Sequence, residues 1–278
     1  MALVPTGQLV KPGRGIGAFN VITLEHAEAI VAGAEAAGLP VILQISENAV
    51  KFHGGRLGPL AAATGAVARA STVDCALHLD HVESVELLHQ APGHGFSSVM
   101  FDASKLEYEA NVAATKSAAE FAHGHGLWLE SELGEVGGKD GAHAPGARTD
   151  PAEAAAFVAA TGVDALAVAV GSSHAMTSRD AALDHDLIAA LKAAVAVPLV
   201  LHGSSGVGDD ELRRAVAGGL VKINVGTALN LAFSASVRES LGADAKLVDP
   251  RKYLTPAREA MAATVAHFLK VVSQVKYA

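Results

Sequence analysis

The sequence has almost none of the features that build disulfide-bonded, membrane-spanning or nucleic-acid-binding proteins. Cys75 is the single cysteine among 278 residues, which excludes an intrachain disulfide and a zinc site built from cysteines. No apolar run approaches the roughly 20 residues of a membrane span, and the N-terminus lacks the pattern of a signal peptide. The 21 basic residues are outnumbered by 29 acidic ones and form no basic patch, which disfavours nucleic acid as a partner. We therefore expect a cytoplasmic protein that binds neither nucleic acid nor membranes.

Aromatic residues are also scarce, at 4%, whereas half of the chain is hydrophobic, so the core must consist of Val, Ile, Leu and Ala. An apolar content this high excludes intrinsic disorder. Short apolar runs alternate with longer segments of helical spacing, such as 24–37, 107–125 and 209–217. The runs predicted as strands are residues 15–20, 40–46, 75–81, 98–103, 126–133, 165–171, 198–203 and 221–226.

Eight strand–helix units of about 30 residues each predict a closed (β/α)8 TIM barrel, with residues 1–278 as a single domain. The alternative is an open, doubly wound parallel sheet. Such a sheet usually carries the GxGxxG motif after its first strand, but here Gly13, Gly15 and Gly17 precede the stretch with strand character. The sequence therefore favours the α/β barrel.

Two segments interrupt the alternation. Residues 134–150 are rich in glycine and follow the fifth predicted strand, which predicts a long loop of the kind that acts as an active-site lid. Residues 249–275 lie beyond the eighth unit and predict an additional C-terminal helix. The segment begins at Asp249, and Thr255 with Pro256 predicts the N-cap and first turn of the helix.

Polar residues accumulate at the carboxyl ends of the predicted strands. A polar group in a strand that is buried on both faces is costly unless it is paired or binds a ligand. The residues at these ends are Asn20, Ser46, His78, Asp80, His81, Asp102, Glu130, Glu132, His174, His202, Lys222 and Asn224. Because the carboxyl ends of all barrel strands converge on one rim, the sequence predicts an active site there.

Three histidines, His81, His174 and His202, each follow a different predicted strand. Three imidazoles at a barrel mouth leave one coordination position open, which is typical of a catalytic zinc site; the alternative is three separately hydrogen-bonded histidines. The neighbouring carboxylates offer further ligands, proton transfer or charge balance, and these are Asp80, Asp102 and Glu132. His78 lies deeper in its strand, which favours a core position or a contact to a metal ligand.

The last two strands are followed by Gly- and Ser-containing stretches, residues 203–206 and 224–227, that precede helices. Barrels often hold a phosphate between the loops that follow strands seven and eight, although each stretch alone is compatible with an ordinary turn. Lys222 lies on the eighth strand. It is either a Schiff-base lysine or one half of a buried ion pair.

Several strings of residues resemble the class II, metal-dependent fructose-bisphosphate aldolases and the related tagatose-bisphosphate aldolases. The resemblance runs from about residue 18 to about residue 271. The strings are HLDH at 78–81, SVMFDAS at 98–104, ESELG at 130–134, GG at 137–138, LHGSSG at 201–206, KINV at 222–225, DPRKYL at 249–254 and AR at 257–258.

The resemblance implies reversible aldol cleavage of a ketose 1,6-bisphosphate to dihydroxyacetone phosphate and glyceraldehyde 3-phosphate. It implies a zinc ion on His81, His174 and His202, and Asp80 as the group that exchanges a proton with the C4 hydroxyl. Asp102 and Glu132 fall at a second or alternate metal position. A monovalent cation, Na⁺ or K⁺, and a homodimer or homotetramer are also implied.

The resemblance assigns the two ends of the substrate to different residues. The dihydroxyacetone phosphate end is implied to lie against Ala175, Gly203, Ser204, Ser205, Asn224, Val225, Gly226 and Thr227. The far phosphate is implied to contact Ser46 and Arg258, the latter from the same or a neighbouring subunit.

Three positions depart from the family pattern. Ala175 stands where glycine is common, and Asp140 stands in the place of a loop glutamate. Gly226 stands where fructose-specific members of one branch carry Asp and tagatose enzymes carry Ala, so this position leaves the preferred sugar open. Lys252 and Arg258 favour fructose 1,6-bisphosphate. The alternatives are a tagatose-bisphosphate or other ketose-phosphate aldolase, a Schiff-base aldolase, and a barrel that binds sugar phosphates without catalysis.

Overall fold

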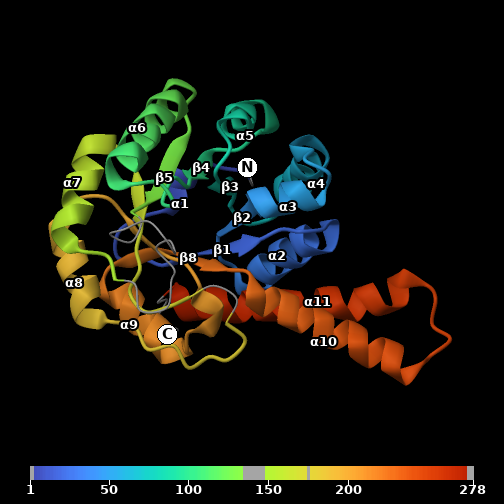
Figure 1. Cartoon of the computed structure of the whole chain (residues 1–278). Coiled ribbons are helices and arrows are strands. Elements are labelled where there is room, and N and C mark those ends of the chain that lie inside the picture. Colours follow the sequence, from blue (N-terminus) through green and yellow to red (C-terminus); the bar gives the residue numbers. More distant parts are fainter. Residues whose placement is uncertain (1–2, 134–147, 174–175, 274–278) are drawn as a thin grey trace.

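The structure is a computed structural model that describes residues 3–133, 148–173 and 176–273. Its centre is a closed barrel in which eight parallel strands pair in chain order and β8 closes onto β1 (Figure 1). The strands are β1 (Ile16–Asn20), β2 (Val41–Ser46), β3 (Cys75–Val82), β4 (Ser98–Phe101), β5 (Trp128–Glu132), β6 (Ala165–Ala167), β7 (Leu199–Leu201) and β8 (Leu220–Val225). The predicted TIM barrel is confirmed, and the open sheet is excluded.

Helices surround the barrel. They are α1 (Thr6–Leu9), α2 (Leu24–Ala37), α3 (Glu47–Phe52), α4 (Leu57–Ala70), α5 (Val85–Gln90), α6 (Tyr108–Gly124), α7 (Pro151–Thr161), α8 (His185–Ala194), α9 (Asp209–Gly218), α10 (Thr227–Ala243) and α11 (Pro250–Val272), with short 3-10 turns at Ala91–His94 and Ser204–Gly206. In the described part of the chain, no helix combines the length and apolar character needed to cross a membrane.

The strands are buried on both faces, as their apolar composition predicts. Outward-facing side chains pack against the helices in the main hydrophobic core. Small inward-facing residues fill the barrel itself, for example Ala18 and Ala76 beside Ile42, and Ala167 beside Met100. With this interior filled, open space is left at the mouth of the barrel.

Strand β6 is shorter than predicted. The expectation ran to residue 171, but the strand ends at Ala167. The backbone N–H of Ala169 bonds to the Thr149 hydroxyl, and the carbonyl of Val170 accepts from Asp184. Because these groups bond outside the sheet, the ladder ends early although the sequence stays apolar.

The additional C-terminal helix is confirmed, but its predicted start at Thr255 and Pro256 is wrong. Helix α11 begins at Pro250, and the Asp249 side chain caps it by accepting from the backbone N–H of Arg251. Pro256 therefore lies inside the helix. Proline in a helix interior removes one hydrogen bond, and the burial of residues such as Met261 against the barrel keeps the helix continuous.

Helices α10 and α11 form an antiparallel hairpin that projects beyond the barrel (Figure 1). Helix α11 packs along both α2 and α10. The approach to α2 is close, because a Cβ on Gly33 would meet the Ala262 carbonyl oxygen at 2.4 Å.

Candidate active site

A cavity of about 650 Å³ opens at the carboxyl ends of the strands. Its position is the one at which TIM barrels place their active sites. Twelve of the residues predicted from the sequence line it: Asn20, Ser46, Asp80, His81, Asp102, Glu132, His202, Gly203, Ser205, Asn224, Gly226 and Thr227. The structure thus brings together most of the predicted site.

Three residues that the resemblance assigns to the substrate do not line the cavity. Ser204 is buried and donates from its hydroxyl to the Leu201 carbonyl, and Val225 is buried in the core. Arg258 lies on α11, where it pairs with Glu28, and it is not among the residues that line the cavity. His174 and Ala175 lie outside the described residues, as do Asp140 and the rest of 134–147.

His81 and His202 face each other across the site. His81 Nε2 lies 3.0 Å from His202 Nδ1. His81 is the one non-glycine residue with a positive φ in the described ranges, at 47°, and it falls where the pairing of β3 with β4 shifts register. A left-handed backbone is strained for such a residue. The irregularity allows His81 to enter the cavity lining directly beside the buried Asp80.

Carboxylates determine which nitrogens of the two rings are protonated. His81 Nδ1 lies 3.1 Å from Asp102 Oδ2, and His202 Nε2 lies 2.9 Å from Glu130 Oε1. An ionised carboxylate accepts hydrogen bonds only, so each outer nitrogen carries its proton. Two lone pairs would then meet at 3.0 Å, which is unfavourable unless a proton or a metal cation lies between them. The donor set therefore fits a metal ion.

The charge of the site agrees with this interpretation. Burial by itself lowers the pKa of His81, but the charge of Asp80, the hydrogen bond that His81 donates to Asp102 and the charge of Glu132 outweigh burial and raise it to about 10. In the protein without metal, a proton therefore occupies the place of a cation. Ligand atoms of Asp80, His81 and His202 all lie within 4.8 Å of one another.

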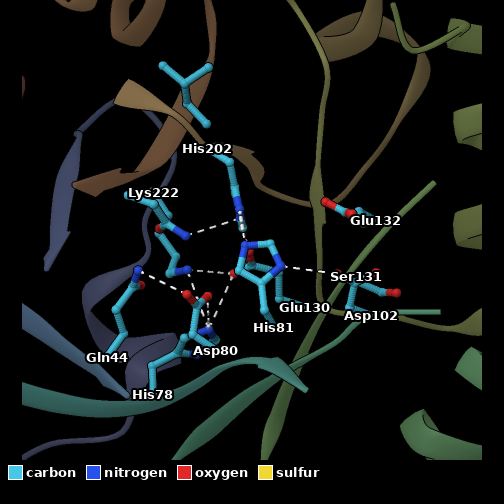
Figure 2. A network of polar contacts seen from close by, with 12 residues as sticks. Gln44, His78, Asp80, His81, Asp102, Glu130, Ser131, Glu132, His202 and Lys222 are labelled. Atoms are coloured by element: carbon cyan, nitrogen blue, oxygen red, sulfur yellow. Dashed lines mark hydrogen bonds and ion pairs between the residues drawn. The ribbon is translucent and has the colours of Figure 1, made fainter. Parts of the chain in front are cut away.

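Asp80 presents an unsatisfied oxygen. Its side chain is buried, Oδ2 accepts from Gln44 Nε2 at 3.3 Å, and Oδ1 has no hydrogen-bond partner and lies 3.7 Å from His78 Nε2 (Figure 2). Burial raises the pKa of Asp80, but the positive charge of His81 and the nearby His78 imidazole overcome this and hold it well below the usual range. Asp80 is thus an ionised base with a free oxygen.

A second group of possible ligands comprises His81, Asp102 and Glu132, whose ligand atoms also lie within 4.8 Å. The Ser104 hydroxyl lies 2.7 Å from Asp102 Oδ1 and 2.8 Å from Glu132 Oε1. The Ser104 backbone N–H also donates to Asp102 Oδ1, at 3.1 Å. Two carboxylates and an imidazole within this distance are a donor set that suits a cation.

Lys222 does not line the cavity. Its Nζ lies 2.8 Å from Glu130 Oε2, and both side chains are completely buried. Burial raises the pKa of Glu130, yet Lys222 and the hydrogen bond from His202 lower it to about 2. The buried ion pair was one of the two interpretations of Lys222, and it is confirmed.

Sequence reasoning missed several lining residues, among them Gln44, Glu47, Lys51, Ser104 and Lys105. Gln44 shares the strand face of Ser46, so alternation along β2 could have indicated it. Ser104 and Lys105 follow β4, where the chain continues over the cavity. Lys51 and Glu47 lie one helical turn apart in α3 and form an ion pair of 2.8 Å.

Comparison with known proteins identifies the class of enzyme. Residues 8–276 match the family model for class II fructose-bisphosphate aldolase. The chain is 39% identical to a fructose-bisphosphate aldolase of Thermus caldophilus, covering 95% of this chain and 94% of that protein. It is also 39% identical to one of Staphylococcus aureus, covering 93% and 91%.

A solved structure agrees. The YdjI aldolase from Escherichia coli K12 superposes with a TM-score of 0.81 at 32% identity, over 95% of this chain and 93% of that one. The chain therefore belongs to the class II fructose-bisphosphate aldolase family. It is a carbon–carbon lyase that cleaves a ketose bisphosphate, from a family that is generally zinc-dependent.

Proposed function

We propose that the chain is a zinc-dependent aldolase that cleaves fructose 1,6-bisphosphate reversibly to dihydroxyacetone phosphate and glyceraldehyde 3-phosphate, in glycolysis and gluconeogenesis. The observation that carries the proposal is the pair of ring nitrogens, His81 Nε2 and His202 Nδ1, 3.0 Å apart beside the unpartnered oxygen of Asp80. The names of the curated relatives support fructose 1,6-bisphosphate as the substrate.

The zinc ion is assigned to His81 and His202, with His174 as the third ligand. When bound, zinc acts as a Lewis acid that stabilises negative charge developing on the substrate. Asp102 and Glu132, with Ser104 between them, are assigned to a second or alternate cation position, which also suits Na⁺ or K⁺.

Asp80 is proposed to accept the proton of the C4 hydroxyl. As that O–H bond breaks, its electron pair forms the C4 carbonyl, and the C3–C4 bond pair moves to C3 and the C2 oxygen as an enediolate. The ionised state of Asp80 and its free Oδ1 support this role. A positioned general base of this kind contributes about 10²–10⁴-fold to a rate.

The phosphate of the dihydroxyacetone end is proposed to bind between the loops after β7 and β8. Gly203 has a φ of +68°, and a Cβ there would meet the Ser173 carbonyl oxygen at 2.4 Å, so only glycine fits. Helix α10 begins at Thr227, and the positive end of the helix dipole there favours an anion. The further residues assigned to this end are Ser204, Ser205, Asn224, Val225, Gly226 and Ala175.

The far phosphate is assigned to Ser46 and Arg258. Ser46 lines the cavity, and its hydroxyl accepts from the backbone N–H of Ala49. Arg258 is paired with Glu28 outside the cavity of its own chain, so its proposed contact with the far phosphate is assigned to a neighbouring subunit of a homodimer or homotetramer. One aldolase domain over residues 1–278 is supported by the family match to 8–276; the cytoplasmic location stays a prediction.

A cleavage assay tests the proposal. Fructose and tagatose 1,6-bisphosphates are supplied separately, with and without EDTA, and dihydroxyacetone phosphate is measured by enzymatic coupling. We expect cleavage of the fructose substrate, loss of activity in EDTA and recovery with zinc. Faster cleavage of the tagatose substrate would establish the alternative sugar, and full activity in EDTA would refute the metal-dependent mechanism.

A further inference from the structure

Buried contacts join Lys222 to His202 behind the wall of the cavity (Figure 2). Lys222 on β8 donates from Nζ to Glu130 Oε2 on β5 at 2.8 Å, and Glu130 Oε1 lies 2.9 Å from His202 Nε2. All three side chains are 0% exposed. Neither Lys222 nor Glu130 lines the cavity, so both can influence the reaction only through the residues they contact.

His202 Nε2 has two neighbours that favour opposite tautomers. Glu130 only accepts hydrogen bonds, so it favours a proton on Nε2 and leaves Nδ1 bare. The Nδ2 group of Asn224 lies 3.1 Å from the same Nε2, and an amide N–H only donates. Asn224 therefore favours a proton on Nδ1, which blocks the nitrogen that faces His81.

The charge of Glu130 decides between these tautomers. Hydrogen bonds to an ionised group are about twice as strong as neutral ones, so the carboxylate prevails over the amide. Lys222 has three donors and no acceptor, and it engages Oε2 while Oε1 stays directed at His202. His78 Nε2 lies 3.5 Å from the Lys222 ammonium, and Ser98 Oγ lies 2.7 Å from His78 Nδ1.

We propose that Glu130 and Lys222 are a positioning pair that selects the His202 tautomer in which Nδ1 is unprotonated and can bind a divalent cation. The inference rests on the metal role proposed above. It assigns a function to two buried charged residues that take no part in the proton transfer. In this proposal, residues on β5 and β8 determine which nitrogen of His202 binds the metal.

Glu130→Gln tests the proposal because Lys222 then attracts the amide oxygen. The amide NH2 turns toward His202 Nε2, both neighbours donate, and the proton moves to Nδ1. We expect zinc affinity, measured by competition with a chromophoric chelator, to fall about 10–100-fold, the range seen for partners of metal ligands. Wild-type zinc affinity in this variant overturns the proposal.

A second substitution distinguishes tautomer selection from general damage. In Glu130→Gln with Lys222→Met, the glutamine oxygen is free to turn to His202, and we expect zinc affinity to recover at least tenfold over Glu130→Gln. A double variant that binds zinc no better than the single one overturns the proposal.

Asn224→Ala keeps the Lys222–Glu130 ion pair and removes the opposing donor, so this variant should bind zinc at least as tightly as wild type. A tenfold loss of zinc affinity counts against the proposal.

The matched control is Glu211→Gln. Glu211 Oε2 bonds His185 Nε2 at 2.9 Å, another histidine–carboxylate pair, and Glu211 does not line the cavity. We expect wild-type zinc affinity, and an equal loss in this variant would contradict the proposal. If wild type itself binds no zinc, the proposed function fails; if wild type binds zinc and Glu130→Gln binds it equally, only the present inference fails.

Discussion

His81 Nε2 and His202 Nδ1 lie 3.0 Å apart although 121 residues separate them in the chain. Each ring is held from its far side by a carboxylate, Asp102 for His81 and Glu130 for His202. The facing nitrogens therefore attract one positive charge to the space between them. In the metal-free protein that charge is a proton, so protons and metal compete for the same nitrogens.

This competition predicts a pH dependence of stability. The pKa of His81 is raised from 6.5 to about 10 in the folded, metal-free protein. A group with a raised folded pKa contributes stability that is complete below pH 6.5 and is lost as pH rises toward about 10. We expect the free energy of unfolding of EDTA-treated protein to fall over this window by at most about 1.4 kcal/mol per pH unit for this proton.

Urea unfolding at pH 7 and pH 9.5 measures the effect. The control is His81→Gln, which lacks the titrating group and should show a smaller decrease between the two pH values. The assignment to His81 fails if the variant and the wild type lose the same free energy over this window.

Asp80→Asn removes the proposed base and keeps the shape of the side chain. Zinc stays bound because the ring nitrogens are unchanged, whereas kcat should fall about 10²–10⁴-fold, as expected for loss of general base catalysis. Turnover on fructose 1,6-bisphosphate and zinc content by atomic absorption are measured on the same sample. Unchanged turnover would refute the assignment of proton transfer to Asp80.

Lys222 should not form an imine with the substrate. The Lys222 ammonium is completely buried and bonds Glu130 at 2.8 Å, and Lys222 does not line the cavity, so its amine is not available to the substrate. We expect borohydride treatment in the presence of substrate to leave the mass of the chain unchanged. A mass increase that maps to Lys222, in a preparation that is active in EDTA, would establish the Schiff-base mechanism instead.

Glu47 should stabilise the loop that follows β3. Its Oε2 accepts from the backbone N–H groups of Glu83 and Ser84 at 2.7 and 3.0 Å, and the side chain is buried. Glu47→Ala removes the acceptor of two part-buried amide groups, and a hydrogen bond of this kind contributes about 0.5–1.5 kcal/mol. We expect the free energy of unfolding in urea to fall by about 1–3 kcal/mol.

The control for Glu47 is the exposed Glu120 on α6, for which Glu120→Ala should change stability by no more than about 0.5 kcal/mol. Because Glu83 and Ser84 closely follow His81, zinc affinity is a second measurement. A stability of Glu47→Ala equal to that of the control would show that these two hydrogen bonds contribute nothing measurable.

Much of the architecture follows from local patterns. The eight largely apolar runs predicted all eight strands, since a strand buried on both faces is made mostly of apolar residues. Asp80, His81, Asp102 and His202 could be predicted as neighbours because parallel strands in a closed barrel bring their carboxyl ends to one rim. The start of α11 was misplaced, because Pro256, in the second turn of a capped helix, has the same local signature as a helix start.

The amino-acid sequence alone therefore determined the barrel and the chemical types gathered at its mouth, since both depend on short-range periodicity and on the order of the strands. Only the tertiary structure decided which nitrogens of His81 and His202 face each other, that Lys222 is paired with Glu130, and that Arg258 turns to Glu28. Side-chain directions and partners of this kind depend on strand register and helix packing between distant segments, and no local pattern encodes them.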